Sequence, residues 1–148
     1  MNVTETIFAL ALASNLDPAH HFQWAYRHIQ TLGRVQFSPI YEIPCRHGIG
    51  ANYWNSACLL TTHLTQYELE MQLKWMEQQA GRVRPSNCIS LDIDLIAWGN
   101  SLNHMLFNAK KQPLPLDVKA PLYALWQHPS LVISSTQRDL LSKVHLHS

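Results

Sequence analysis

Two aspartates in alternation with apolar residues carry the clearest chemistry of this chain. Asp92 and Asp94 alternate with Leu91, Ile93 and Leu95. A period of two is typical of a strand, so both carboxylates should share one face, roughly 7 Å apart at about 3.3 Å of rise per residue. Such carboxylates repel each other, and a hard divalent cation such as Mg²⁺ relieves that repulsion. The pattern predicts a Mg²⁺ site, and two solvated acids on an exposed strand are the alternative.

Two arginines precede this segment. Arg82 and Arg84 follow a helix-like run and a glycine, Gly81. The planar guanidinium group binds phosphate through two parallel hydrogen bonds. Next to a Mg²⁺ site, these arginines are expected to serve the phosphates of a ligand.

Composition limits the classes of protein to which the chain can belong. With 148 residues, 47% of them apolar, we expect a single domain, 1–148, with a real core. A charged fraction of 14% and a net charge of +1 argue against a general nucleic-acid or membrane-surface binder. No apolar run approaches the roughly 18 residues of a membrane span. Three cysteines without a C-x-x-C pair, and no signal-peptide pattern, favour a cytoplasmic protein with reduced thiols.

The order of the predicted elements indicates an α+β fold. Apolar periodicity predicts strands at 5–12, 34–42, 53–62 and 90–97, and helices at 17–32 and 65–80. This order, strand-helix-strand-strand-helix-strand, is that of a ferredoxin-like βαββαβ core, an antiparallel sheet with two helices on one face. Residues 101–148 form a C-terminal extension that is left to cover the other face, and Ser134 with Gln137 is expected to cap a short helix there.

Local signals fix several boundaries. Asp17 followed by Pro18 predicts a helix start with Asp17 as N-cap. Thr65 and Glu68 have the spacing of a capping box at the start of the second helix. Pro39 lies inside the second predicted strand and indicates an edge position or an irregularity there.

These pieces, taken in order, resemble a known family, the 6-hydroxymethyl-7,8-dihydropterin pyrophosphokinases of folate biosynthesis. The resemblance covers roughly residues 7 to 126 and rests on short motifs at matching spacings. They are Ala13-Ser14-Asn15, Ser38 to Tyr41 with Pro44, Tyr53-Trp54-Asn55, Glu77 with Gly81-Arg82-Val83-Arg84, Leu91-Asp92-Ile93-Asp94 and Gly99-Asn100.

The resemblance implies a reaction in which ATP gives its β,γ-pyrophosphoryl group to the pterin hydroxymethyl and AMP leaves. Positioning and charge neutralisation dominate such transfers. By the family's pattern, Asp92 and Asp94 hold Mg²⁺ and act in catalysis with Arg82 and Arg84.

The same resemblance implies two sets of binding residues. The pterin contacts are Ile43, Pro44, Tyr53, Asn55 and Tyr123. The nucleotide contacts are Glu77, Arg82, Arg84 and Lys110. For Tyr53 and Tyr123, core filling is the alternative role, and for Asn55 it is that of a satisfied buried amide. The expected partners are ATP and the pterin alcohol, with no nucleic acid or membrane, and the protein is expected to be a monomer or weak dimer.

Departures from the family concentrate on the triphosphate side. The segment 85–91 is short and lacks a tryptophan, and Ile89 lies where an arginine is expected. The stretch after Gln112 lacks a histidine, and Pro121 replaces another arginine. Since one positioned arginine can be worth about 10³ to 10⁵ in rate, these losses predict low activity. A pterin-binding paralogue with impaired catalysis and an interaction protein that binds neither ligand remain the alternatives.

Overall fold

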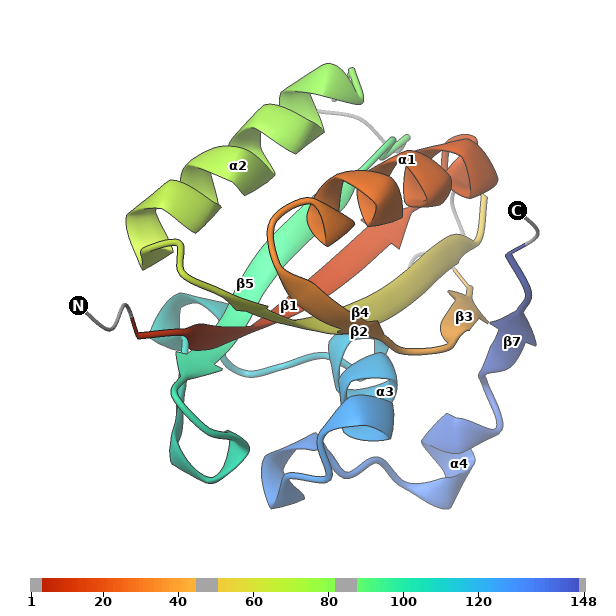
Figure 1. Cartoon of the computed structure of the whole chain (residues 1–148). Coiled ribbons are helices and arrows are strands. Elements are labelled where there is room, and N and C mark those ends of the chain that lie inside the picture. Colours follow the sequence, from red (N-terminus) through yellow and green to blue (C-terminus); the bar gives the residue numbers. More distant parts are fainter. Residues whose placement is uncertain (1–3, 45–50, 82–87, 147–148) are drawn as a thin grey trace.

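Antiparallel pairing joins seven strands into one sheet in the part of the chain that the structure describes. The computed structural model describes residues 4–44, 51–81 and 88–146. The strand order is β6-β5-β1-β4-β3-β7, and β2 also pairs with β4 (Figure 1). The strands are β1 (Thr6–Ser14), β2 (Arg34–Phe37), β3 (Ile40–Ile43), β4 (Tyr53–Thr62), β5 (Asp92–Gly99), β6 (Met105–Phe107) and β7 (Ser142–Val144). The predicted α+β class with an antiparallel sheet is confirmed.

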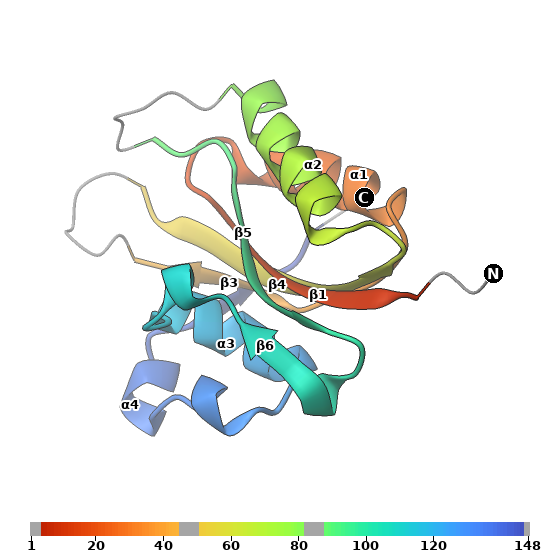
Figure 2. The ribbon, with the colours of Figure 1, turned by 90° about the vertical axis from the view of Figure 1, so that its left-hand side faces the viewer.

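Helices lie on both faces of this sheet. The α-helices are α1 (Pro18–Gln30), α2 (Gln66–Gln79), α3 (Leu116–Leu125) and α4 (Ser135–Arg138). Figure 1 shows α1 and α2 on one face and α3 on the other, and Figure 2 shows the same layers from the side. Among the described helices, none has the combination of length and apolar character needed to cross a membrane.

Strand β1 separates two hydrophobic clusters. Phe8, Leu10 and Leu12 belong to the cluster beneath α1 and α2. Ala9 and Ala11 point the other way, into the cluster on the side of α3. Their short side chains leave room for α3, which packs on β4. The expectation that the C-terminal part covers the second face is therefore confirmed.

The predicted strand 34–42 is interrupted at Ser38 and Pro39. The pairing with β4 shifts by one residue between Phe37, opposite Cys58, and Tyr41, opposite Asn55. The amide of Ala57 donates to Ser38 Oγ at 2.8 Å, so a hydroxyl replaces a backbone acceptor there. Because proline has no N–H for the ladder, an irregularity at this point is the expected outcome.

The two predicted N-caps behave differently. Thr65 and Glu68 form the capping box, with Glu68 N donating to Thr65 Oγ1 at 3.1 Å and Thr65 N to Glu68 Oε1 at 2.9 Å. Asp17 occupies the N-cap position of α1 but has φ 47 and ψ 54, and its side chain accepts no capping hydrogen bond. The predicted side-chain cap is wrong because the left-handed backbone differs from the extended backbone usual at an N-cap.

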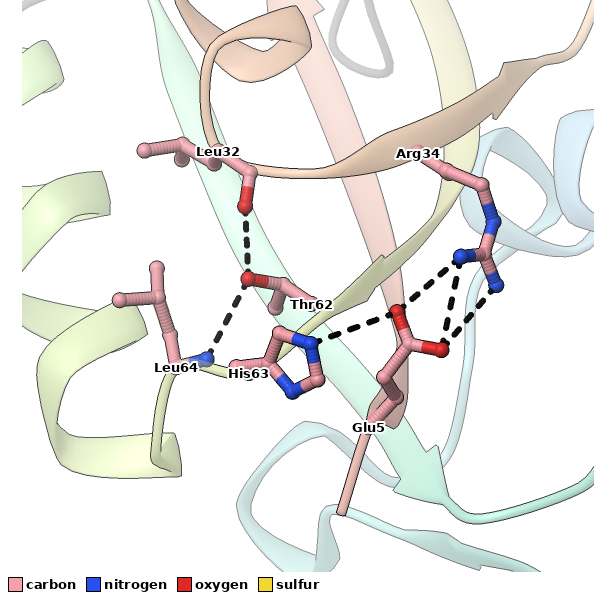
Figure 3. A network of polar contacts seen from close by, with 6 residues as sticks. All are labelled: Glu5, Leu32, Arg34, Thr62, His63 and Leu64. Carbon is pink, nitrogen blue, oxygen red and sulfur yellow. Dashed lines mark hydrogen bonds and ion pairs between the residues drawn. The ribbon is translucent and has the colours of Figure 1, made fainter. Parts of the chain in front are cut away.

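Polar contacts tie together the end of the sheet where β1 begins. Glu5 Oε2 lies 3.1 Å from Arg34 Nη1 and 3.9 Å from His63 Nε2 (Figure 3). Thr62 Oγ1 donates to the carbonyl of Leu32 at 2.6 Å. These contacts join the connection before β2 to the connection after β4. They lie at the C-terminal end of β4 and do not involve its N-terminal end.

Candidate functional site

A cavity of about 580 Å³ opens at the C-terminal end of β1. Its lining residues are Ala13, Ile43, Pro44, Tyr53, Asn55, Ile89, Asp92, Leu116, Asp117 and Leu140. Five of them are predicted site residues from three segments of the chain: Ile43 and Pro44, Tyr53 and Asn55, and Asp92. The volume is within the usual range for small-molecule sites.

Sheet register explains why Asn55 and Asp92 share this cavity. On the central strand β1, Ala13 lies directly opposite Asn55 of β4 on one side and Asp92 of β5 on the other. Directly paired residues point to the same face of a sheet. Ala13 is the smallest side chain of the three, so it forms a low floor between an amide and a carboxylate. Tyr53 lies two residues before Asn55 and therefore has the same orientation.

The side chain of Asn55 is buried and incompletely hydrogen-bonded. Only 2% of the residue is exposed, and within the described ranges Nδ2 has no hydrogen-bond partner. A buried donor left without an acceptor costs about 1 to 3 kcal/mol. Because Asn55 lines the cavity, an acceptor atom on a bound ligand would remove this cost.

The alternation predicted around the two aspartates is confirmed. Leu91, Ile93 and Leu95 are buried in the cluster beneath α1 and α2. Asp92 and Asp94 are partly buried and lie opposite Ala13 and Ala11 of β1, so they share the other face. Asp92 lines the cavity, whereas Asp94 does not.

The donor set fits Mg²⁺. Two carboxylates on one strand face are hard oxygen ligands, and Mg²⁺ in proteins often takes only one or two of them. The described residues contain no group of three or more histidine, cysteine, aspartate or glutamate side chains that could hold a metal ion. Phosphate and water oxygens would therefore complete the coordination shell.

A lysine contacts the second aspartate. Lys111 Nζ lies 2.9 Å from Asp94 Oδ1. A turn at Ala109–Lys111 carries this lysine, and Asn108 ties the turn to β5 by donating from Nδ2 to the carbonyl of Leu95 at 2.9 Å. Lys110, the lysine assigned to the nucleotide, is exposed on the same turn. The structure thus places Lys111, the neighbour of Lys110, in contact with Asp94.

Two further contacts hold the segment that carries the aspartates. Glu77 of α2 accepts a hydrogen bond from the backbone N–H of Ile93 at 2.9 Å, between the two acids. Asn15, just after β1, accepts from Ile89 N through Oδ1 at 2.6 Å and donates its own backbone N–H to Ile89 O at 2.9 Å. Glu77 therefore supports the strand directly, and Ile89 is fixed at the cavity.

Other predicted site residues are not among those that line the cavity in the described part of the chain. Tyr123 lies on α3 and packs against the cluster on that side of the sheet, and it is not among the cavity-lining residues. Gly81 follows the C-cap residue of α2, Ala80, and has φ 77, a conformation that favours glycine. Arg82 and Arg84, which follow it, lie outside the described residues.

Sequence reasoning missed three cavity residues: Leu116, Asp117 and Leu140. Leu116 and Asp117 begin α3, and Leu140 lies between α4 and β7. No local pattern marks these positions, because their place at the cavity depends on how the C-terminal part folds back on the sheet.

The antiparallel sheet with helices on both faces defines an α+β protein, and the cavity at the end of the sheet has the size of a small-molecule site. A family model described as 7,8-dihydro-6-hydroxymethylpterin-pyrophosphokinase (HPPK) matches residues 9–128. The chain belongs to the HPPK family, as its motifs indicated. This family consists of ATP-dependent pyrophosphokinases of folate biosynthesis. No curated protein matches the chain.

Proposed function

We propose that the protein transfers pyrophosphate from ATP to 6-hydroxymethyl-7,8-dihydropterin, which gives AMP and the pterin diphosphate. One observation carries the proposal: the unpartnered amide nitrogen of buried Asn55 lies in the same cavity as Asp92. The amide is suited to the hydrogen-bonding edge of a heterocycle. The carboxylate is suited to a metal that bridges phosphates and the substrate hydroxyl.

The pterin end of the site needs flat apolar walls and a few polar groups. Tyr53 offers a ring face, and Ile43 and Pro44 lie at the end of the neighbouring strand, where Ile43 is paired with Tyr53. Asn55 would hydrogen-bond the ring edge. This combination of apolar walls and one buried amide supports a planar heterocyclic ligand. Tyr123 stays a predicted stacking residue on the family's pattern, and in this structure it packs against the cluster on the side of α3.

Charged groups would bind the phosphates at the other end of the site. Mg²⁺ bound at Asp92 and Asp94 would neutralise the developing charge on the phosphates. We assign Lys111 to the phosphate oxygens once Asp94 coordinates the metal, because its Nζ is already 2.9 Å from the carboxylate. Arg82, Arg84, Glu77 and Lys110 are assigned to the nucleotide side on the family's pattern.

A second candidate is a pterin-binding paralogue with impaired transfer. Ile89 favours it, because an apolar side chain occupies the place of an expected arginine and two hydrogen bonds to Asn15 fix its backbone. The pterin contacts are retained in this reading, whereas the phosphate contacts are reduced.

Further expectations accompany the proposal. We infer a ferredoxin-like core from the order β5-β1-β4-β3 with α1 and α2 on one face. Cys58 is a buried free thiol, which agrees with a reducing, cytoplasmic location. A monomer or weak dimer, with no nucleic-acid or membrane partner, stays a prediction.

The test is AMP formation from ATP, Mg²⁺ and the pterin alcohol, paired with calorimetry for the pterin. AMP above background that depends on the pterin supports the enzyme. Tight pterin binding without AMP supports the paralogue. Absence of pterin binding, with and without a non-hydrolysable ATP analogue, would refute both.

A further inference from the structure

The chain beyond residue 128 lies outside the family match, yet it reaches the proposed pterin cavity. The match covers residues 9–128. Leu140, twelve residues further on, lines the cavity together with Ile43, Pro44 and Leu116. The wall that it forms therefore belongs to a segment that the family model does not describe.

The position of Leu140 is fixed from both sides. Before it, α4 begins with a capping box in which Ser134 Oγ accepts from Gln137 N at 3.1 Å. After it, β7 pairs with β3, with Val144 opposite Ile40. Figure 1 shows α4 leading into β7 beside β3. The segment is thus part of the sheet and not a loose tail.

The side chain of Leu140 exposes apolar surface that a bound ligand would cover. Leu140 is 56% exposed although it lines the cavity. Covering its methyl groups with a flat ring would remove apolar surface from water. Leu116, which is partly exposed, and Ile43, which is 8% exposed, line the same cavity, so the three residues can contact one planar ligand.

We propose that Leu140 contacts the pterin and that the C-terminal segment 129–146 is part of the substrate site. The inference rests on the proposed function and adds a residue to it. Leu140 supplies an apolar wall and no polar contact, so it affects affinity for the ring and leaves affinity for the nucleotide unchanged.

The chain offers a matched control. Val132 lies in the same segment, is 55% exposed, and is not among the residues lining the cavity. Calorimetry with the pterin alcohol should show a dissociation constant about fivefold higher for Leu140→Ala, from the lost apolar contact, and no change for Val132→Ala. Leu140→Met keeps the apolar volume and should restore affinity. The dissociation constant for a non-hydrolysable ATP analogue should be the same in all variants.

Methyl NMR gives a readout independent of mutation. The Leu140 methyl signals should shift on addition of pterin, and those of Val132 should not. Equal pterin affinity for Leu140→Ala and Val132→Ala, with unshifted Leu140 methyls, would overturn the contact and leave the proposed function intact. A wild-type chain that binds no pterin would overturn the proposed function and this inference together. Thermal unfolding of each variant identifies any loss of affinity that comes from loss of the fold.

Discussion

Replacing Lys111 by methionine should change metal and nucleotide binding in opposite directions. Lys111 Nζ and Asp94 Oδ1 are 2.9 Å apart, with 39% and 32% of the two side chains exposed. Partly exposed pairs of this kind contribute about 0 to 1 kcal/mol. A metal that binds Asp94 must either displace this lysine from Oδ1 or bind Oδ2 next to its positive charge, and both lower the affinity for the metal. Lys111→Met should therefore tighten the binding of Mg²⁺ alone by at most about fivefold.

The nucleotide should respond in the other direction. A charge-assisted hydrogen bond from the lysine to a phosphate contributes about 1.5 to 3 kcal/mol, so its loss should weaken binding of a Mg²⁺–ATP analogue about 10- to 100-fold. Isothermal calorimetry of the metal alone, and then of the analogue at saturating Mg²⁺, measures both effects. Lys74→Met, at an exposed position of α2 to which no ligand is assigned, is the control, and Lys110→Met on the same turn tests the neighbouring lysine.

The directions in which Mg²⁺ binding and analogue binding change in Lys111→Met test the role assigned to this lysine. If Lys111→Met weakens the binding of Mg²⁺ alone, the lysine does not compete for Asp94. If analogue binding is unchanged in Lys111→Met but lost in Lys110→Met, the phosphate contact belongs to Lys110. Either result would refute the assignment of Lys111.

Three other changes test the site and the core. Asp92→Ala should abolish Mg²⁺-dependent nucleotide binding, because one of the two carboxylate ligands is lost; unchanged Mg²⁺ dependence in calorimetry would exclude this metal ligand. Asn55→Ala should weaken pterin binding at least about tenfold by calorimetry, and it should cost little stability because it also removes a buried unpaired donor; a large loss of stability with unchanged affinity would indicate a structural role. Burial raises the pKa of Tyr26, whose hydroxyl donates to Ser56 Oγ at 2.8 Å. The folded state therefore binds this proton more tightly than the unfolded chain, and stability should fall as pH rises above about 10, the ordinary pKa of tyrosine. Urea unfolding between pH 8 and 11 should show a shallower fall in Tyr26→Phe, and an identical fall would contradict the assignment. Burial raises the pKa of Cys58 as well, so some decline should persist in the variant.

Features set by neighbouring residues were predictable from the sequence. The capping box of Thr65 and Glu68 depends on residues three apart. The bounds of β4, Tyr53–Thr62, match the predicted strand because alternation and turn signals define both ends. The two faces of the segment around Asp92 follow from the period of a strand alone.

Features set by distant residues were not predictable. The contact of Lys111 with Asp94 depends on how Asn108 ties its turn to β5. The place of Leu140 depends on the pairing of β7 with β3. In both cases no spacing along the chain encodes the contact. At Asp17 the sequence signal was local, but the predicted side-chain cap was wrong. The backbone of Asp17 is left-handed, and its side chain accepts no capping hydrogen bond.

The hydrogen bond from Ile93 to Glu77 also bears on how the protein avoids aggregation. Strand β6 pairs with β5 only from Ala97 to Gly99, so the part of β5 with the two acids has a side that no described strand occupies. On that side Glu77 binds the N–H of Ile93, and Asn108 binds the carbonyl of Leu95. Open strand edges recruit strands from other molecules, and side chains that satisfy the backbone prevent such recruitment. The side of β5 next to the two acids is thereby protected from pairing with a strand of another molecule.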